Sequence, residues 1–343
     1  MHDAPQHGPR PLPLFLEMLR EETAASPERR AAALAGLKAY QQAPRKGRKR
    51  PAPARFRRQR VRLRDYGGNG RAVIFVPSLI NPPAILDLAP QNSLLRWCSE
   101  QGLHPYLLDW GEPSPADRAL DVTAHVERIL LPLIARLDEP PLLVGYCLGG
   151  TLALGAATAG AVAGIALIAT PWHFAGFGGG REAIGELWQA AKPACETMGL
   201  VPMEVLQAGF WRLDPARTVG KYEAFGRMEP GSPGWNGFIA LEDWANAGAP
   251  LPYEAGRQLF EEFVGGDLTG TGGWRVAGRT VDPHALPCPA IEFVSLSDRI
   301  VPKESAANLT DRRDLGAGHV GMVVGGRAKV QLWEPLADWL KRA

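Results

Sequence analysis

The sequence predicts an α/β fold in which helices cover both faces of a mostly parallel central sheet. Short apolar runs that suit buried strands alternate with runs that suit helices. The longest uncharged stretch, residues 140–180, contains no Asp, Glu, Lys or Arg. Glycines and Pro171 interrupt this stretch, so it suits a buried strand, a turn, a helix and another strand rather than a membrane span.

The expected elements follow one another from residue 61 onward. The run 72–77 is continuously apolar, as expected of a strand that is buried on both faces. Apolar residues recur every three or four positions over 121–137, which predicts an amphipathic helix. By the same criteria, strands are expected at 61–66, 104–109, 141–144, 165–170 and 289–295, and helices at 93–101, 151–157 and 327–342.

Four segments are predicted along the chain. Residues 1–60 are expected to be an N-terminal extension, helical at first and then basic, rich in Pro and Arg and flexible. Residues 61–171 and 286–343 are expected to be the two parts of the α/β core. Between them, glycine clusters and six tryptophans break the alternation, which predicts a helical cap subdomain over 172–285.

Basic side chains are concentrated in one short stretch. Residues 45–64 hold eleven of the 38 Lys and Arg residues and no acidic residue, which leaves 27 basic against 36 acidic residues elsewhere. Such a stretch suits nucleic acid, an anionic membrane surface or an acidic partner. It lacks a series of interleaved aromatic residues. A solvated linker with alternating Arg at an edge strand is therefore favoured, and no nucleic-acid partner is expected.

The cysteines and the N-terminus indicate a reducing compartment. Four cysteines, at 98, 147, 195 and 288, show no CxxC spacing, so neither a zinc site nor a disulfide framework is predicted. The N-terminus lacks the basic start and apolar core of a secretion signal. We therefore expect a cytoplasmic protein with no transmembrane segment and no metal.

Cys147 lies in the most informative motif, the hexapeptide Gly-Tyr-Cys-Leu-Gly-Gly at 145–150. An apolar run precedes it and a run of small residues follows, which is the strand–turn–helix context of a nucleophile elbow. The usual elbow has Ser where this chain has Cys. A thiolate is a stronger nucleophile and a better leaving group, so it suits an enzyme that accepts an acyl group from a thioester and passes it on. The alternative is a buried core cysteine.

A nucleophilic Cys needs a base, and the base needs a group that fixes its tautomer. After an elbow these partners follow in the order acid, then histidine, each in a loop after a strand. Asp298 follows the strand expected at 289–295, and His319 lies in a glycine-rich loop before the last helix. We therefore predict Cys147, His319 and Asp298 as the catalytic residues. The competing candidates are His2, His7, His104, His125, His173, His284, Asp109 and Asp314.

The tetrahedral intermediate of acyl transfer needs backbone N–H donors for its oxyanion. One is expected from Leu148, the residue after the nucleophile. The other is expected from the loop after the strand at 72–77, where Leu79 and Ile80 are the candidates.

With this order of motifs, the chain is predicted to have an α/β-hydrolase fold with a helical cap.

The chain also resembles the catalytic subunit of polyhydroxyalkanoate synthases, most closely the short class III type, which carries a lipase-like Gly-x-Cys-x-Gly-Gly box. Two departures are Arg299, where the family commonly has His, and the N-terminal 60 residues, which have no recognised counterpart. The resembling segments are 76–81, 85–87, 107–111, 145–150, 238–244, Cys288-Pro289, Asp298 with Pro302, and Gly318-His319.

The resemblance implies an acyltransferase that polymerises hydroxyacyl-CoA through a thioester on Cys147, with release of CoA. His319 would be the general base and Asp298 would orient it. No cofactor is implied, because CoA is part of the substrate. The implied partners are hydroxyacyl-CoA, a second, non-catalytic synthase subunit and a second copy of the chain in a homodimer. The implied location is the cytoplasm, on the surface of polyester granules.

Two other functions are compatible with parts of the sequence. A hydrolase of the same fold would use the same Cys-His-Asp triad with water as the acceptor: a thioesterase, an esterase or a polyester hydrolase. The cysteine favours transfer over hydrolysis, because it suits repeated thioester exchange. A granule-associated or regulatory protein without activity is disfavoured, because the motif retains a nucleophile, a base and an acid in order.

Overall fold

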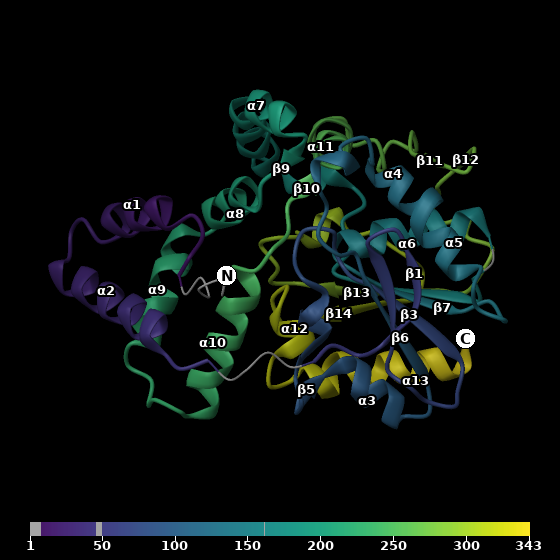
Figure 1. Ribbon diagram of the computed structural model, residues 1–343, viewed down its shortest axis with the longest axis horizontal. Helices are drawn as coiled ribbons and strands as arrows, with labels where there is room; N and C mark the ends of the chain where they lie inside the picture. Colours follow the sequence, from purple (N-terminus) through teal and green to yellow (C-terminus); the bar gives the residue numbers. More distant parts are fainter. Residues whose placement is uncertain (1–7, 46–49, 161) are drawn as a thin grey trace. The chain divides into compact units, whose positions relative to one another are not determined.

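An eight-stranded sheet forms the centre of the computed structural model, which describes residues 8–45, 50–160 and 162–343 (Figure 1). The two strands at one edge are antiparallel to their neighbours, and all other neighbours are parallel. This is the strand order of the α/β-hydrolase fold, so the predicted fold class is confirmed. In spatial order the strands are β1 (Ala54–Arg58), β2 (Val61–Asp65), β6 (His104–Asp109), β3 (Ala72–Val76), β7 (Leu142–Tyr146), β8 (Gly164–Ile168), β13 (Ala290–Ser295) and β14 (Arg312–Leu315).

Helices cover both faces of this sheet. Figure 1 shows α3 (Leu94–Glu100) and α13 (Glu334–Arg342) on one side, and α4 (Val122–His125), α5 (Leu131–Ile134) and α6 (Leu148–Ala159) on the other. The start of α3 follows from its sequence, because the side chain of Ser93 accepts a hydrogen bond from the Arg96 amide and so caps the helix. A wider π-type turn, η3 (Val126–Leu130), joins α4 to α5. Every residue of β7 and β8 is buried, as their apolar runs predict.

Shorter elements connect and extend the sheet. Before the elbow they are η1 (Pro83–Leu86), β4 (Asp87–Ala89), β5 (Asn92–Ser93) and η2 (Pro115–Asp117). After β8 they are η4 (Phe174–Phe177), α7 (Gly180–Met198), β9 (Leu200–Val201), β10 (Leu251–Pro252), α11 (Tyr253–Arg257), η5 (Gln258–Gly265), β11 (Arg275–Val276) and β12 (Arg279–Thr280). Near the C-terminus they are η6 (Lys303–Ser305), α12 (Gly321–Val324) and η7 (Lys329–Trp333).

The chain folds into two compact units. The sheet unit comprises residues 51–202 and 249–343. The helical unit comprises the described part of residues 1–50 together with Met203–Gly248. The helices of the helical unit are α1 (Leu12–Glu22), α2 (Pro27–Gln42), α8 (Met203–Arg212), α9 (Pro215–Phe225) and α10 (Pro233–Ala245).

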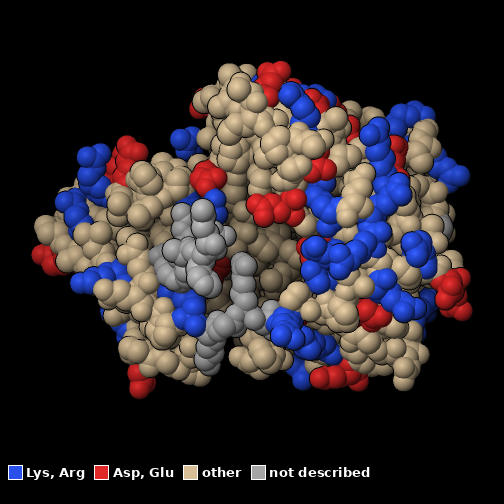
Figure 2. Space-filling view, in the orientation of Figure 1, with Lys and Arg blue, Asp and Glu red and all other residues tan. Residues whose placement is uncertain are grey.

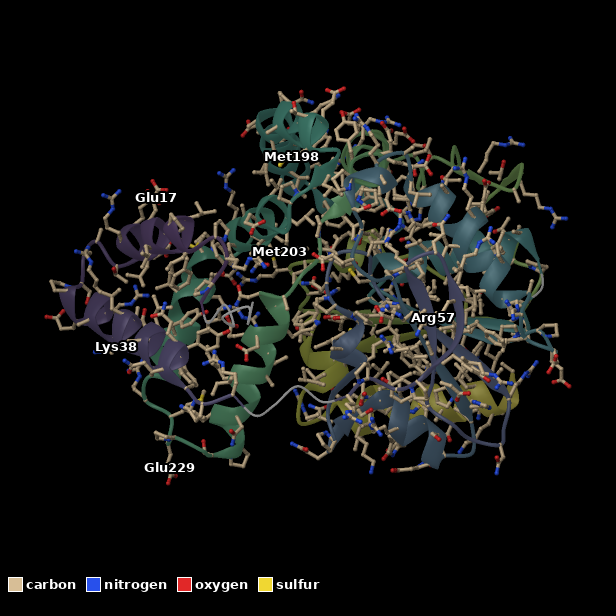
Figure 3. All side chains as sticks on the ribbon, in the orientation of Figure 1. Glu17, Lys38, Arg57, Met198, Met203 and Glu229 are labelled. Carbon is tan, nitrogen blue, oxygen red and sulfur yellow. The ribbon has the colours of Figure 1, made fainter. Side chains whose placement is uncertain are left out.

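This division differs from the predicted boundaries, which separated residues 1–60 from a continuous cap at 172–285. Aromatic packing explains the difference, because Phe15 of α1 lies against the rings of Trp211 and Tyr222 at 5.7 and 4.9 Å. Tyr40 of α2 donates a hydrogen bond of 2.6 Å to Asp243 of α10. The N-terminal helices therefore share a core with the middle of the predicted cap. Glu17 and Lys38, labelled in Figure 3, lie exposed on the outer sides of α1 and α2.

The basic stretch is more ordered than expected, although residues 46–49 lie outside the described part. β1 is an edge strand whose Arg57, labelled in Figure 3, lies opposite Arg62 of β2. The Phe56 ring lies beneath the guanidinium groups of Arg55 and Arg136, at 5.6 and 4.9 Å. Figure 2 shows Lys and Arg gathered on the face of the sheet unit that carries β1. The favoured interpretation of an Arg-bearing edge strand is thus confirmed.

Two kinds of feature are absent from the described residues. None of the helices there combines the length and the apolarity that a bilayer crossing demands. The same residues contain no cluster of three or more His, Cys, Asp or Glu side chains that could hold a metal ion.

Candidate active site

Cys147 occupies the sharp turn between β7 and α6. Its backbone has φ 55° and ψ −133°, a conformation that costs a non-glycine residue on the order of 1–3 kcal/mol. Two hydrogen bonds hold it there: its amide donates to the Ile168 carbonyl at 2.9 Å, and its carbonyl accepts from the Gly150 amide at 2.8 Å. The turn is therefore fixed by the neighbouring strand β8 and by the first turn of α6.

The glycines of the hexapeptide are required by close backbone packing. A Cβ atom at Gly145 would lie 2.3 Å from the Cα of Gly150. At Gly149 it would lie 2.0 Å from the Val76 carbonyl oxygen, and at Gly150 it would lie 1.8 Å from the Thr170 hydroxyl. The Gly-x-Cys-x-Gly-Gly pattern thus follows from how tightly α6 packs against β3 and β8 at the elbow.

His319 and Asp298 meet from two different loops. Asp298 follows β13 and His319 lies between β14 and α12, yet His319 Nδ1 is 2.6 Å from Asp298 Oδ2. The other carboxylate oxygen accepts hydrogen bonds from the amides of Ile300 and Val301, at 2.7 and 3.0 Å. Because the carboxylate serves as acceptor throughout, Nδ1 is the donor, and Nε2 is left to face other groups.

The charges around His319 favour its protonated form. Burial by itself lowers the pKa of His319, but the negative charges of Asp298 and of the Cys147 thiolate raise it more. Hydrogen bonds from His319 to both groups act in the same direction. The pKa of His319 therefore lies above its ordinary value, which favours a positive charge beside the Cys147 sulfur, the kind of environment that activates a catalytic cysteine. Cys147 itself is half-buried.

Tyr146 is part of the same cluster, and no sequence motif predicted its role. The Tyr146 ring stacks on the His319 imidazole, with centroids 5.1 Å apart and planes inclined by 29°. Its hydroxyl donates a hydrogen bond to the His319 carbonyl at 3.2 Å. Only its position next to Cys147 at the end of a strand could have singled it out.

The predicted oxyanion donors come from the elbow and from the loop after β3, and they differ in availability. Leu148 is the first residue of α6, and the described residues offer no hydrogen-bond acceptor to its N–H. The Ile80 amide already donates to Ser78 Oγ at 3.2 Å, whereas the N–H of Leu79 has no such partner within the described part of the chain. The geometry thus favours Leu148 and Leu79 over Ile80 as the pair of donors.

Two of the competing histidines of the sheet unit, His125 and His104, are engaged elsewhere. His125 is fully buried; its Nδ1 contacts the Asp121 carbonyl at 2.6 Å and its Nε2 contacts the Arg60 guanidinium at 3.0 Å. Burial lowers the pKa of His125 to about 4. His104 pairs with Asp65 at 2.7 Å, next to the sheet edge. The partners of these two histidines therefore explain their presence without a catalytic role.

The competing acids are likewise paired. Asp109 forms an ion pair of 2.7 Å with Arg64, and Asp314 forms one of 2.7 Å with Arg312. The structure thus brings Cys147, His319 and Asp298 together, while the candidates His2 and His7 lie outside the described residues. The catalytic roles of these three residues stay a prediction.

Comparison with known proteins gives relatives of one kind, although no family model matches the sequence. The poly(3-hydroxyalkanoate) polymerase subunit PhaC of Haloferax mediterranei is 30% identical over 314 residues, covering 85% of this chain and 64% of that protein. The PhaC subunit of Haloarcula marismortui is 28% identical over 284 residues, covering 78% and 60%. The PhaC subunit of Thiocystis violacea is 26% identical over 290 residues, covering 78% and 80%. The chain thus spans somewhat under two thirds of the first two relatives.

Solved structures are more distant. A bromoperoxidase from Bacillus anthracis superposes with a TM-score of 0.49 at 13% identity, over 82% of this chain and 95% of that one. The α/β hydrolase GrgF from Penicillium sp. sh18 superposes with a TM-score of 0.49 at 20% identity, over 82% and 94%.

Proposed function

We propose that this chain, which is similar to the PhaC polymerase subunits, is an acyltransferase that polymerises hydroxyacyl groups from hydroxyacyl-CoA. The observation that carries the proposal is Cys147 at a strained elbow beside His319, whose pKa it helps to raise and which Asp298 holds in turn. A cysteine in this place suits an enzyme whose acyl group arrives as a thioester and leaves to another hydroxyl.

In the first half of the proposed reaction, the Cys147 thiolate attacks the carbonyl carbon of the CoA thioester. The carbonyl oxygen becomes an oxyanion, which the amides of Leu148 and Leu79 stabilise. When the intermediate collapses, the C–S bond to CoA breaks, and the leaving CoA thiolate takes the proton of the His319 imidazolium. The products are free CoA and an acyl group bound to Cys147 as a thioester.

In the second half, a hydroxyl group from another hydroxyacyl unit attacks the acyl-Cys147 thioester. Neutral His319 accepts the hydroxyl proton as the ester bond forms, and Cys147 leaves as a thiolate. The imidazolium–thiolate pair is thereby restored. Asp298 keeps Nδ1 protonated throughout, so that Nε2 exchanges the proton.

The reaction requires no metal and no bound cofactor, because CoA belongs to the substrate. The word "subunit" in the relatives' names supports a second, non-catalytic polypeptide as a partner. We extend the proposal to that partner, to a homodimer, and to action in the cytoplasm on the surface of polyester granules.

The test is incubation of the purified protein with 3-hydroxybutyryl-CoA, with CoA release and insoluble polymer measured together. The proposal expects both, and it expects Cys147→Ala to abolish both. Release of CoA with free hydroxy acid and no polymer would instead identify water as the acceptor, and so a hydrolase that uses the same triad. Release that persists in Cys147→Ala would refute the nucleophile assignment.

A further inference from the structure

We propose that Tyr146 is a positioning residue that holds the His319 imidazole in the orientation in which it reaches Cys147 and Asp298 at once. The inference deepens the proposed function, since it rests on His319 as the base of that reaction. In this role Tyr146 contacts neither the substrate nor the reacting atoms, and it acts through His319.

Two separate contacts join Tyr146 to a residue 173 positions away. The ring covers one face of the imidazole, at 5.1 Å between centroids, and the hydroxyl binds the backbone carbonyl of the same residue at 3.2 Å. Tyr146 is 3% exposed, so both contacts are shielded from water. One contact acts on the side chain of His319 and the other acts on its loop.

The ring contact restricts a rotation that Asp298 leaves open. A single hydrogen bond from Nδ1 to Asp298 fixes one axis, but the imidazole can still turn about that axis and carry Nε2 away from Cys147. A ring stacked on the imidazole face blocks this rotation. The face of an aromatic ring also attracts a cation, so the same contact favours the imidazolium over the neutral form.

The hydroxyl contact compensates for a permissive loop. Gly316, Gly318 and Gly321 surround His319, and a Cβ atom at any of them would meet nothing within 4 Å. Neighbouring atoms therefore do not confine this backbone, and hydrogen bonds must hold it in place. The Tyr146 hydroxyl supplies one to His319 itself, and the Ser295 hydroxyl supplies another to the Ala317 carbonyl.

The elbow thus positions both the nucleophile and the aromatic ring that holds the base. Tyr146 and Cys147 are consecutive, so the turn that presents the nucleophile also sets where the base-holding ring lies. The titratable groups that face His319 are Asp298 from the loop after β13, Cys147 from the elbow and Tyr146 from β7. Among these, Tyr146 stays neutral, because burial raises its pKa well above its ordinary value.

The experiment measures the pH dependence of Cys147 alkylation by iodoacetamide in the full chain, followed at the Cys147 peptide by mass spectrometry. This readout reports the imidazolium–thiolate pair and needs no polymerase activity. The variants are Tyr146→Phe, which keeps the ring, and Tyr146→Leu, which removes it. Tyr106→Leu is the matched control, since Tyr106 is also buried and stacks on a histidine, His104, at 4.5 Å outside the site.

We expect the wild type and Tyr106→Leu to share the same alkylation midpoint. Tyr146→Leu should move this midpoint up by about one pH unit, and so lower the alkylation rate about tenfold at pH values below both midpoints. Tyr146→Phe should keep most of the wild-type midpoint but lower the turnover of hydroxyacyl-CoA, because its loop lacks the hydroxyl anchor.

Two results would overturn the inference. If Tyr146→Leu loses thermal stability as Tyr106→Leu does but keeps the wild-type midpoint, Tyr146 only fills space. If wild-type Cys147 is alkylated as an ordinary thiol, there is no ion pair for Tyr146 to position. The proposed function fails separately, if the Tyr146→Leu shift is observed but the wild type releases no CoA from 3-hydroxybutyryl-CoA.

Discussion

The carboxylate of Asp298 divides its two oxygens between two tasks. Oδ1 accepts the amides of Ile300 and Val301, and Oδ2 accepts Nδ1 of His319 at 2.6 Å. The backbone thus determines which oxygen faces the histidine. Replacement of this carboxylate by an amide, which has one oxygen and one NH₂ group, should therefore change which nitrogen of His319 carries the proton.

Asp298→Asn should impose the wrong tautomer on His319. The Asn oxygen must face the two amides, so its NH₂ group faces Nδ1, and the proton moves to Nε2. We expect turnover of hydroxyacyl-CoA to fall by about 10⁴-fold, the loss known for this substitution in a Ser-His-Asp triad. Asp314→Asn is the matched control, because Asp314 is paired with Arg312 and not with His319. Equal activities of the two variants would remove Asp298 from the mechanism.

Gly150→Ala should disrupt the elbow. The new methyl group would lie 1.8 Å from the Thr170 hydroxyl, which belongs to a buried segment that follows β8. We expect a loss of several kcal/mol in the free energy of unfolding, as for other overpacked cores, or a displaced Cys147 without activity. The control is Gly185→Ala on α7, where the methyl group meets open space and should raise helix stability slightly. Denaturant unfolding monitored by circular dichroism separates the two, and a wild-type midpoint for Gly150→Ala would contradict the packing.

Phe15→Ala should destabilise the helical unit. Phe15 is completely buried between Trp211 and Tyr222, and removal of a buried Phe side chain costs about 3–5 kcal/mol. The next residue provides the control, since Leu16 is 40% exposed and Leu16→Ala should change little. Thermal denaturation measures both variants. If Phe15→Ala melted like the wild type, the N-terminal helices would not share a core with α8 and α9.

His125 should make stability depend on pH below neutrality. Its pKa is lowered to about 4 in the folded chain, chiefly by burial, against about 6.5 when unfolded. The unfolded state therefore binds the proton first as the pH falls. The stabilisation is complete above pH 6.5 and is lost progressively down to about pH 4, by roughly 3 kcal/mol in total.

His125→Gln removes this titration, although it also lowers stability at pH 8 by disturbing the contact with Arg60. The stability difference between pH 8 and pH 5, measured by urea unfolding, should therefore be smaller in the variant than in the wild type. Equal differences would show that other groups account for the pH dependence.

The parts of the fold that the sequence predicted are those with a local pattern. β7 and α6 are recognisable because a continuous apolar run, a glycine-flanked cysteine and a run of small residues follow one another within twenty positions. Asp298 and His319 were found because chain order and strand ends restrict where the partners of an elbow nucleophile can lie. The same reasoning excluded His125, and in the structure the Nε2 atom of this histidine contacts the Arg60 guanidinium.

The parts that escaped prediction depend on contacts between distant segments. The helical start of the N-terminal segment was predicted, but the partners of Phe15, Trp211 and Tyr222, lie about two hundred positions away, and nothing in the local sequence indicates the pairing. The stacking of Tyr146 on His319 and the engagement of the Ile80 amide by Ser78 are likewise set by tertiary geometry. Periodicity identifies which face of an element is buried, but it does not identify what covers that face.

The charged edge strands have a consequence for how copies of this chain meet. β1 and β14 are the two ends of the eight-stranded sheet, and both present arginine side chains, among them Arg57 and Arg313. A second molecule whose own β1 tried to continue the hydrogen-bond ladder at β1 would bring like charges into a desolvated contact. The sheet is therefore protected against growth from one molecule to the next. An enzyme that carries a lengthening, water-insoluble product would benefit from this protection. Enzyme molecules that are crowded at the product surface would not associate through their sheet edges into fibres.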